Sequence, residues 1–593
     1  MVSQQPLTAL PSFLTGSTNR TFAANPRKLR RHALTSSWRK HANPGALSVR
    51  ASIADAPPDK KDRAKPAQVR SPLLDADVPE YVKEAVRTQP WKGVLEPSTE
   101  RSFTVDSSHV KGRIPDDLRG TYYRLGPGNT RMGERKQGHW FDGDGMIYAF
   151  SLDGFNESVT FRSRWIDTPR IRQRLAAPEN KVAGKGVWTP ADGGPFANVG
   201  SMENPSNTAP NYFNGQLLAL AEGGPPREVN PGTLDTVGKE LSYVGDLAFS
   251  AHPKIDLDTG IMYNHGVNPE PSLNILGLQL FKNSPDGKLL KQTRVPLDGP
   301  TYVHDLMISE NYMITIIPPW YSTKADLLQF ALGLKKFGDS FKWVPERGTR
   351  AVVARKSDLE VVADVKLPSF SMYHNANAYE EDGKLHLVTC RLNGSRADLE
   401  TVMADLWEST WCWDSLSSLW DYTFDTKTWA LISEGPAAKR ADGTPTPAHG
   451  HDFPTIHPAL TGKKMRYVYV LANANCGRLE APVSRGGYVG AAKVPGSDSP
   501  GAPAFYNCYE KYDLETGEVE EYNVGRASSD TVFVPKAGGE KEDDGYLLAV
   551  AYNEDRHTSS VVVVDAESMS GVCEIELPVH VTTTFHGCWV PKS

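Results

Sequence analysis

The sequence lacks three features that would each assign the chain to a class of protein. No run of about 18 apolar residues occurs in its 593 residues, so the sequence offers no segment for a helix that spans a membrane. The formal net charge is −6, whereas a nucleic-acid-binding protein carries a basic stripe. Only six cysteines are present and none forms a CxxC pair, so we interpret them as reduced thiols. The composition, 39% hydrophobic and 23% charged, is that of a globular protein that is soluble or peripheral to a membrane.

Acidic residues are absent from residues 1–54, which contain eight Lys and Arg together with many Ser and Thr. This composition is typical of an organelle transit peptide, and Val49–Ser52 resembles a plastid processing site. We therefore predict a plastid transit peptide over 1–51, a disordered polar linker over 52–75 and a folded domain over 76–593. The predicted location is the chloroplast or another plastid, in the stroma or at the periphery of a plastid membrane. The alternative interpretation is a disordered basic tail.

The predicted folded domain has the pattern of short strands without helical partners. From Phe103 onward, β-branched and aromatic runs alternate with turn signals. The clearest runs are Val361–Leu367, Leu385–Cys390, Tyr467–Leu471, Tyr546–Ala551 and Ser560–Val564. Hairpin tips are predicted where Asp or Thr precedes a Gly that can take a positive φ: Asp256–Gly260, Ser284–Gly287, Glu381–Gly383, Asp513–Gly517 and Asp543–Gly545. The pattern predicts an all-β fold, a β-propeller, preceded by a short amphipathic helix over Asp77–Arg87.

One segment, Ile314–Val344, has apolar residues at helical spacing. They are Leu327, Leu328, Phe330, Ala331, Leu334 and Phe337, with Lys335 and Lys336 beside them. This spacing predicts an amphipathic helix inserted between strands. It either caps the propeller core or dips into a membrane surface, and the Phe, Leu and Lys content favours peripheral membrane contact through residues 324–343.

Four of the fifteen histidines occur in similar settings near predicted strand ends: His252, His304, His374 and His586. Their wide separations place them on different blades, and a propeller brings inner-strand residues of separate blades to its axis. Neutral imidazoles are ligands for Fe, Cu, Zn or Ni. Spacing alone leaves the choice open, because His449, His451 and Asp452 with His457 form a rival set whose Pro- and Gly-rich surroundings predict an exposed loop.

Several motifs between residues 100 and 593 resemble the carotenoid cleavage oxygenase family, in the order expected for it. They are Gly120–Asn129 (GTYYRLGPGN), Phe141–Met146 (FDGDGM), Leu218–Gly224 (LALAEGG), Trp343–Gly348 (WVPERG) and Phe585–Pro591 (FHGCWVP). The resemblance implies a seven-bladed β-propeller whose active-site face is capped by short helices and loops. It also implies one Fe(2+) per chain, held by His252, His304, His374 and His586. We interpret Phe141–Met146 as a structural turn.

The resemblance further implies that carboxylates orient the ligand histidines by fixing their tautomer and ring direction. The matching residues are Glu222, Asp452 and Asp530, and the expected pairings are Glu222 with His304, Asp452 with His374 and Asp530 with His586. Both aspartates are one methylene shorter than the glutamates of the family. The backbone must therefore lie closer, a water must bridge the gap, or the histidines are held less firmly.

By the same resemblance, the chain is expected to be a non-haem Fe(II) dioxygenase. It would cleave a C=C bond of a lipophilic polyene, a carotenoid or apocarotenoid, with O₂ to give aldehyde or ketone products, and no protein nucleophile is needed. An apolar tunnel would set which bond is cut. Candidates for its lining are Phe196, Trp320, Tyr321, Phe330 and Trp343.

Three alternatives remain open at this point. A stilbenoid-cleaving relative would use phenol-activating groups, for which Tyr122 and Tyr123 are candidates, although no matching lysine is evident. An isomerase acting on a polyene ester would keep the same iron site. A non-catalytic propeller that binds pigment or a protein is the third, and the presence of all four histidines argues against it.

Overall fold

The structure is a computed structural model that describes most of the chain beyond residue 70. The described residues are 71–132, 135–176, 186–189, 203–222, 224–241, 243–245, 247–269, 276–392, 406–407, 417–446, 450–474 and 505–592. The predicted transit peptide lies outside them. The predicted linker lies partly within them, because a 3₁₀ helix over Pro72–Leu74 buries the Leu73 side chain.

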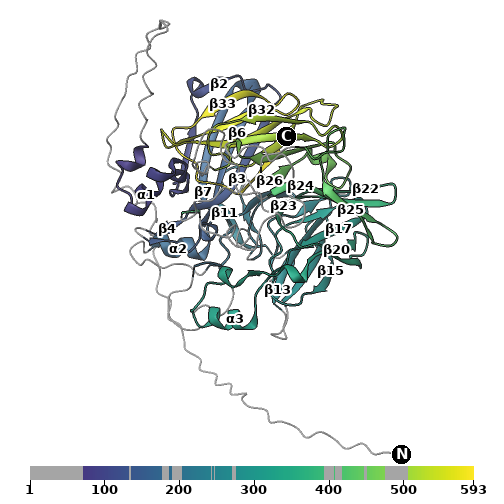
Figure 1. Ribbon diagram of the computed structural model, residues 1–593. Helices are drawn as coiled ribbons and strands as arrows, with labels where there is room; N and C mark the ends of the chain where they lie inside the picture. Colours follow the sequence, from purple (N-terminus) through teal and green to yellow (C-terminus); the bar gives the residue numbers. More distant parts are fainter. Residues whose placement is uncertain are drawn as a thin grey trace, which may run out of the picture. The chain divides into compact units, whose positions relative to one another are not determined.

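Seven antiparallel sheets of four or five strands form the blades of a β-propeller (Figure 1). From the innermost strand outward, the first blade contains β34 (His586–Pro591), β3 (Arg119–Asn129), β6 (Asp144–Asp153), β7 (Ser158–Trp165) and β1 (Arg101–Thr104). The second contains β8 (Ala209–Phe213), β9 (Gln216–Leu220), β10 (Arg227–Val229) and β11 (Thr236–Glu240). The third contains β12 (Lys254–Ile255), β13 (Met262–Pro269), β14 (Leu276–Asn283) and β15 (Leu289–Pro296).

The remaining four blades follow in chain order. The fourth contains β16 (Leu306–Ile308), β17 (Tyr312–Ile317), β20 (Thr349–Arg355) and β21 (Val361–Leu367), and the fifth contains β22 (Ser371–Glu381), β23 (Lys384–Leu392), β24 (Ser417–Asp425) and β25 (Leu431–Pro436). The sixth contains β26 (His451–Thr455), β27 (Tyr467–Ala472), β28 (Cys508–Asp513) and β29 (Val519–Asn523). The seventh contains β30 (Val532–Pro535), β31 (Gly545–Asn553), β32 (Thr558–Asp565), β33 (Ser570–Glu576) and β2 (Val110–Gly112).

Smaller elements complete the described part of the chain. Two short hairpins pair β18 (Trp320–Tyr321) with β19 (Lys342–Trp343) and β4 (Arg131–Met132) with β5 (Arg135–Lys136). The α-helices of the described residues are α1 (Glu80–Thr88), α2 (Pro169–Ala176) and α3 (Lys324–Ala331). No helix of the described residues is long and apolar enough to cross a membrane.

The two ends of the folded unit close the ring of blades. The last strand, β34, pairs with β3 in register from Gly120 opposite Pro591 to Leu125 opposite His586. Conversely, the early strand β2 pairs with β33 of the seventh blade, beside which it lies in Figure 1. Each end of the unit therefore completes a blade at the other end: β34 is the innermost strand of the first blade, and β2 is the outermost strand of the seventh.

The apolar core lies between neighbouring blades. One cluster joins Tyr148 and Phe161 of the first blade to Val561 and Val563 of the seventh. Strand β31 is buried along almost its whole length, which explains its continuous apolar run, because both of its faces pack against other blades. The packing holds the blades in fixed positions around the axis, and this fixes where each innermost strand begins.

The strands and turns predicted from the sequence are confirmed. Each of the predicted runs lies in a strand, β21, β23, β27, β31 or β32, and a helix, α1, occupies most of Asp77–Arg87. The tip at Gly260 has the expected φ of 68°. Gly545 differs, because its φ is not positive; a Cβ atom there would meet the Phe533 ring at 2.2 Å, so the close approach of that ring requires glycine.

The helix predicted within Ile314–Val344 is wrong in its extent. Helix α3 has only eight residues, and Leu334 and Phe337 lie beyond its end. Gly333 takes a φ of 73° just after the helix, a conformation that ends helices. No residue of α3 is fully buried, but Phe330 packs against Phe337 with 5.4 Å between ring centroids, and Phe337 packs against the buried cluster that contains Trp320 and Trp343. Other apolar residues of Ile314–Val344 lie in strands: Ile314, Ile316 and Ile317 are buried in β17, Trp320 and Tyr321 in β18, and Trp343 in β19.

Candidate metal centre

The four histidines singled out in the sequence lie at the start of innermost strands on four different blades. His252 and His304 each stand two residues before their strands, β12 and β16, whereas His374 lies in β22 and His586 opens β34. Innermost strands of neighbouring blades contact one another near the axis. The structure therefore brings together four residues that are far apart in the sequence, and their ligand atoms all lie within 4.8 Å of one another.

The Nε2 atoms of the four rings face a common point. The Nε2 of His304 lies 3.0 Å from that of His252 and 3.1 Å from that of His374. The Nε2 atoms of His374 and His586 are 3.3 Å apart. Two ligands at a right angle on a metal with bonds of about 2.1 Å stand roughly 3.0 Å apart, so the spacing matches neighbouring positions around one ion.

Three of these histidines contact a carboxylate through the other ring nitrogen. His304 Nδ1 contacts Oε1 of Glu222, His374 Nδ1 lies 3.0 Å from Oδ1 of Asp452, and His586 Nδ1 lies 3.3 Å from Oδ2 of Asp530. A proton on Nδ1 that is donated to a carboxylate leaves Nε2 with its lone pair. Lone pairs of buried acceptors that face one another at about 3 Å are costly unless a cation lies between them, so the arrangement fits a metal ion.

The three carboxylates come from the three blades that supply no histidine. Glu222 follows β9 of the second blade, Asp452 lies in β26 of the sixth, and Asp530 stands two residues before β30 of the seventh. Each blade thus contributes one histidine or one carboxylate. Both aspartates contact their histidines directly, although each is one methylene shorter than glutamate. The backbone therefore lies close enough for the shorter side chain to reach the histidine.

Burial and these contacts set the protonation of the rings. Burial, together with the neighbouring histidines, holds the pKa of His252 well below its ordinary value. Burial also lowers the pKa of His586 to about 4, even though Asp530 acts in the opposite direction. For His304, the charge of Glu222 and the hydrogen bond to it outweigh burial, and the pKa is raised. The carboxylate that stabilises a protonated His304 would equally stabilise one that holds a cation.

Sequence reasoning missed three residues next to the histidines. The Tyr302 hydroxyl lies 3.0 Å from Nδ1 of His304, and the Tyr373 ring packs against the His304 ring with 5.6 Å between centroids. Arg124 is fully buried and forms an ion pair with Asp530. A signal was available for each: the tyrosines are one or two residues from a ligand histidine, and Arg124 lies within the motif Gly120–Asn129.

The candidate tunnel residues differ in burial and in what they pack against. Trp320 and Trp343 are buried and pack against each other with 5.4 Å between ring centroids, in a cluster that includes Tyr302 and Tyr373. The buried Tyr321 carries the Arg347 guanidinium 4.1 Å from its ring centroid. Phe330 is half-buried on α3. Phe196 lies outside the described residues.

The rival histidine set does not assemble as an exposed loop. His451 is buried in β26, where its Nδ1 lies 3.2 Å from the Tyr512 hydroxyl, so the prediction of exposure is wrong for this residue. His457 accepts a hydrogen bond from the Ala459 N–H and begins a 3₁₀ helix. His449 lies outside the described residues. Asp452 belongs to the four-histidine centre instead, because neighbouring residues of a strand point to opposite faces.

The acidic residues of Phe141–Met146 form hydrogen bonds and ion pairs within the fold, and none of these contacts involves one of the four histidines. Asp142 accepts hydrogen bonds from the N–H groups of Val187 and Trp188, and Asp144 forms ion pairs with Arg170 and Arg174. The two tyrosines weighed for a phenol substrate are also engaged. Tyr123 donates to the carbonyl of Pro231, and Tyr122 accepts from Arg124.

Comparison with known proteins agrees with this geometry. The family model described as retinal pigment epithelial membrane protein matches residues 96–591. Apocarotenoid-15,15'-oxygenase of Synechocystis is 29% identical, over 81% of this chain and 92% of the relative. Carotenoid 9,10(9',10')-cleavage dioxygenase 1 of Phaseolus vulgaris is also 29% identical, over 84% and 89% respectively. The crystal structure of cobalt-substituted Synechocystis ACO superimposes with a TM-score of 0.70 at 26% identity, covering 85% of this chain and 98% of that one. The chain belongs to the family of the retinal pigment epithelial membrane protein, the carotenoid cleavage oxygenase family that its motifs resemble.

Proposed function

We propose that this chain is a non-haem iron dioxygenase that cleaves a C=C bond of a carotenoid or apocarotenoid. The observation that carries the proposal is the convergence of His252, His304, His374 and His586 in a chain whose relatives are named carotenoid and apocarotenoid oxygenases. One O₂ and one C=C bond give two C=O groups. Both oxygen atoms enter the products, and no external reductant is required.

The four histidines would hold one Fe(2+) per chain through Nε2. A closed-shell polyene reacts only slowly with O₂, and iron bound there would activate the O₂. An all-histidine set leaves the ion its full charge and open positions. Glu222, Asp452 and Asp530 would keep the ring orientation fixed by holding Nδ1 of His304, His374 and His586.

The aromatic cluster beside His304 would position the polyene. Trp320, Trp343, Tyr302 and Tyr373 form an apolar wall that reaches the ring of His304. A rigid polyene that lies along such a wall is excluded from water, and its register against the histidines sets which bond is cut. We propose that Tyr321, Phe330 and Phe196 also line this path.

Cleavage is tested with the chain lacking residues 1–51, loaded with iron and incubated with detergent-dispersed carotenoids, apocarotenoids and hydroxystilbenes. In ¹⁸O₂, chromatography with mass detection should find two fragments of one polyene, each carrying one ¹⁸O atom, and no product under anaerobic conditions. An enzyme that binds iron but forms no oxygen-dependent product would contradict the proposal. Geometric isomers in place of fragments would indicate an isomerase, and a cleaved stilbene would identify the other substrate class.

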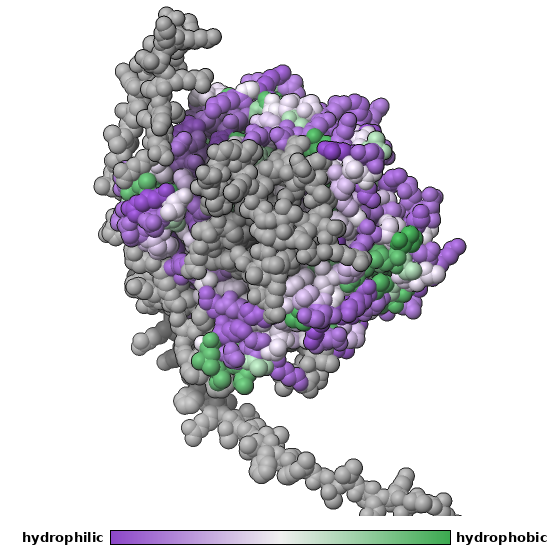
Figure 2. All heavy atoms as spheres, in the orientation of Figure 1, coloured by the Kyte–Doolittle hydropathy of each residue, from purple (hydrophilic) through white to green (hydrophobic). Residues whose placement is uncertain are grey.

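We propose that α3 and the residues after it contact a membrane surface, from which a lipophilic substrate would enter. Leu328 is 58% exposed and Leu334 is 75% exposed, and Lys324 lies at the start of the helix. Figure 2 shows hydrophobic side chains gathered at the place of α3 in Figure 1, next to hydrophilic ones. Exposed leucines beside lysines suit an interface of acyl chains and anionic headgroups.

Changing both Leu328 and Leu334 to Asp is expected to weaken binding to vesicles of phosphatidylcholine and phosphatidylglycerol by roughly tenfold or more, because two apolar side chains no longer enter the interface. Co-sedimentation measures the bound fraction. Leu257→Asp is the matched control, since Leu257 is 59% exposed on another blade. If this control weakens binding equally, or if the double variant binds like wild type, α3 is not the contact.

We propose that residues 1–51 direct the chain to plastids and that 52–75 connect them to the propeller domain, 76–593. The acid-free composition of the first 54 residues supports this, and two relatives from Arabidopsis thaliana carry the word chloroplastic in their names. A fluorescent protein fused behind residues 1–75 should enter chloroplasts in plant cells. A fusion that stays in the cytosol would contradict the proposal.

A further inference from the structure

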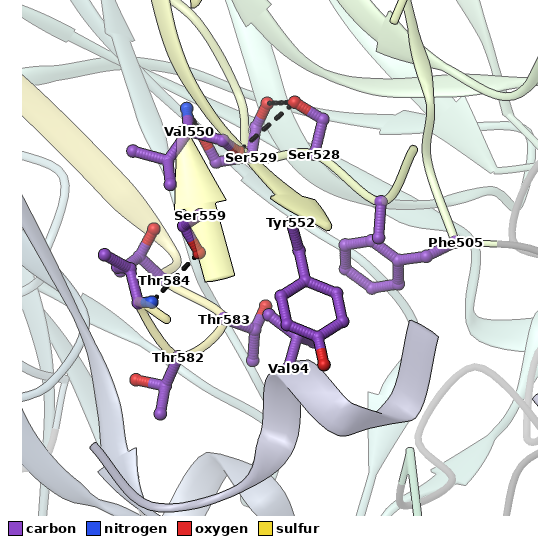
Figure 3. Close-up of a pocket in the computed structure, with 12 residues that line it drawn as sticks. Val94, Phe505, Ser528, Ser529, Val550, Tyr552, Ser559, Thr582, Thr583 and Thr584 are labelled. Atoms are coloured by element: carbon purple, nitrogen blue, oxygen red, sulfur yellow. Dashed lines mark hydrogen bonds between the residues drawn. The ribbon is translucent and has the colours of Figure 1, made fainter. Parts of the chain in front are cut away.

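Two segments bring His586 and its carboxylate to the centre. Residues 528–530 lead to Asp530, and residues 582–585 lead to His586. Both line a small pocket together with Tyr552, Phe505 and Val94, as Figure 3 shows. Ser528 and Thr582–Thr584 are buried, and backbone hydrogen bonds join the segments to other residues of the pocket: the Ser529 N–H donates to the Val550 carbonyl and the Thr583 N–H to the Val94 carbonyl. On their other side the segments meet β3, where the Phe585 N–H donates to the Leu125 carbonyl.

Arg124 of β3 lies on the side of the two segments that faces β3, and its side chain has no exposed surface. Its guanidinium contacts both segments. In the first, Nη1 forms an ion pair with Oδ1 of Asp530 and lies 3.4 Å from the Asp530 carbonyl oxygen. In the second, Nε donates to Oγ1 of Thr584 at 2.9 Å, and Nη2 lies 3.4 Å from the Phe585 carbonyl oxygen. Nη1 also lies 3.3 Å from the Tyr122 hydroxyl of the same strand.

The Asp530 carboxylate is thus shared between a cation and a ligand histidine. One oxygen contacts Arg124, and the other lies 3.3 Å from Nδ1 of His586. Glu222 and Asp452 form no ion pair with a Lys or Arg among the described residues. Asp452 instead accepts the N–H of Phe453 at 2.7 Å, and Glu222 lies by the Tyr302 hydroxyl, which itself contacts His304. His586 is the histidine whose carboxylate is held by a buried guanidinium.

We infer that Arg124 is a positioning residue for His586. It orients the Asp530 carboxylate toward Nδ1, so that the Nε2 of His586 points at the other three histidines. The inference rests on the proposed metal site. It assigns a role to a residue that does not touch the histidines, and it makes His586 depend on a contact that His304 and His374 do not need.

A buried arginine can also be purely structural, so the test needs a readout that lost stability alone would not change. Removing a partner behind a ligand histidine lowers metal affinity by roughly 10- to 100-fold in other sites. If Arg124 acts through Asp530, the two residues share that loss. Removing Arg124 from a chain that already lacks the Asp530 charge should then have little further effect.

Four proteins are compared: wild type, Arg124→Met, Asp530→Asn and the double variant. Each metal-free protein is titrated with Co²⁺ and followed by its visible absorption. Both single variants are expected to bind Co²⁺ roughly 10- to 100-fold more weakly than wild type, with a changed absorption spectrum. The double variant should lie within about threefold of Asp530→Asn. Equal affinity and spectrum for wild type and Arg124→Met, or multiplied losses in the double variant, would overturn the inference.

Arg170→Met is the matched control. Arg170 and Asp144 form a buried ion pair that contacts none of the four histidines, so this variant should bind Co²⁺ like wild type. Arg124→Lys keeps the charge with fewer donors, and an intermediate affinity is expected; if Arg124→Met does not fold, wild-type affinity of Arg124→Lys overturns the inference. A wild-type chain that binds no metal would instead refute the proposed function.

Discussion

The His304→Ala chain is expected to purify without iron and to lose oxygen-dependent cleavage by about 1000-fold or more. The Nε2 atom of His304 lies between two other ligand atoms, at 3.0 Å from the Nε2 of His252 and 3.1 Å from the Nε2 of His374. Its removal opens one side of the site and leaves Glu222, whose side chain is 27% exposed, without its histidine. Three imidazoles and a carboxylate that no longer holds a histidine form a different set of ligands, and O₂ activation depends on the metal.

Metal analysis of the purified chain and the ¹⁸O₂ assay check this prediction together. His386→Ala is the matched control, because His386 also contacts a carboxylate through Nδ1, that of Asp421 at 3.1 Å, but lies outside the four-histidine set. The control should keep its iron and its activity. Iron content of His304→Ala equal to that of wild type, with a normal circular dichroism spectrum, would contradict the assignment of the metal site.

Much of the fold could be predicted because it depends on local signals. Strands such as β21 and turns such as Asp256–Gly260 are determined by side-chain type within a few residues, and both are where the sequence places them. The predicted helix around α3 is too long because Leu334 and Phe337 continue the helical spacing of apolar residues beyond Ala331. The positive φ of Gly333 is the local feature that ends the helix before Leu334.

The candidate site could not be derived from spacing alone. His252 and His586 approach each other only because β34 closes the first blade, which is a property of the whole ring. The resemblance to a known family supplied what local patterns lacked. It pointed to Glu222, Asp452 and Asp530. It did not point to Tyr302, which contacts His304 directly, or to Arg124, which contacts Asp530, because those contacts depend on how β3 and the fourth blade pack near the axis.

A chain that stops after Phe585 is expected not to fold to a soluble monomeric protein. The stop removes β34, which pairs with β3 over six residues and contacts β8 and β30 of the adjoining blades. Its loss leaves the buried N–H and C=O groups of β3 without partners and opens the first blade at the axis. At roughly 1–3 kcal/mol for each buried group left unpaired, the loss exceeds about 5 kcal/mol, the lower end of the stability of a typical domain.

The full-length His586→Ala chain separates closure of the ring from metal binding, because it removes the imidazole of β34 and keeps its ladder with β3. We expect this variant to fold with a wild-type circular dichroism spectrum but to bind no iron, whereas the truncated chain should be recovered mainly in aggregates. A truncated chain that is soluble and melts at the wild-type temperature would show that β34 is dispensable for closure. Loss of folding in both chains would instead show that the His586 side chain itself is needed by the fold, so that β34 serves the ring through its ligand as well as through its backbone.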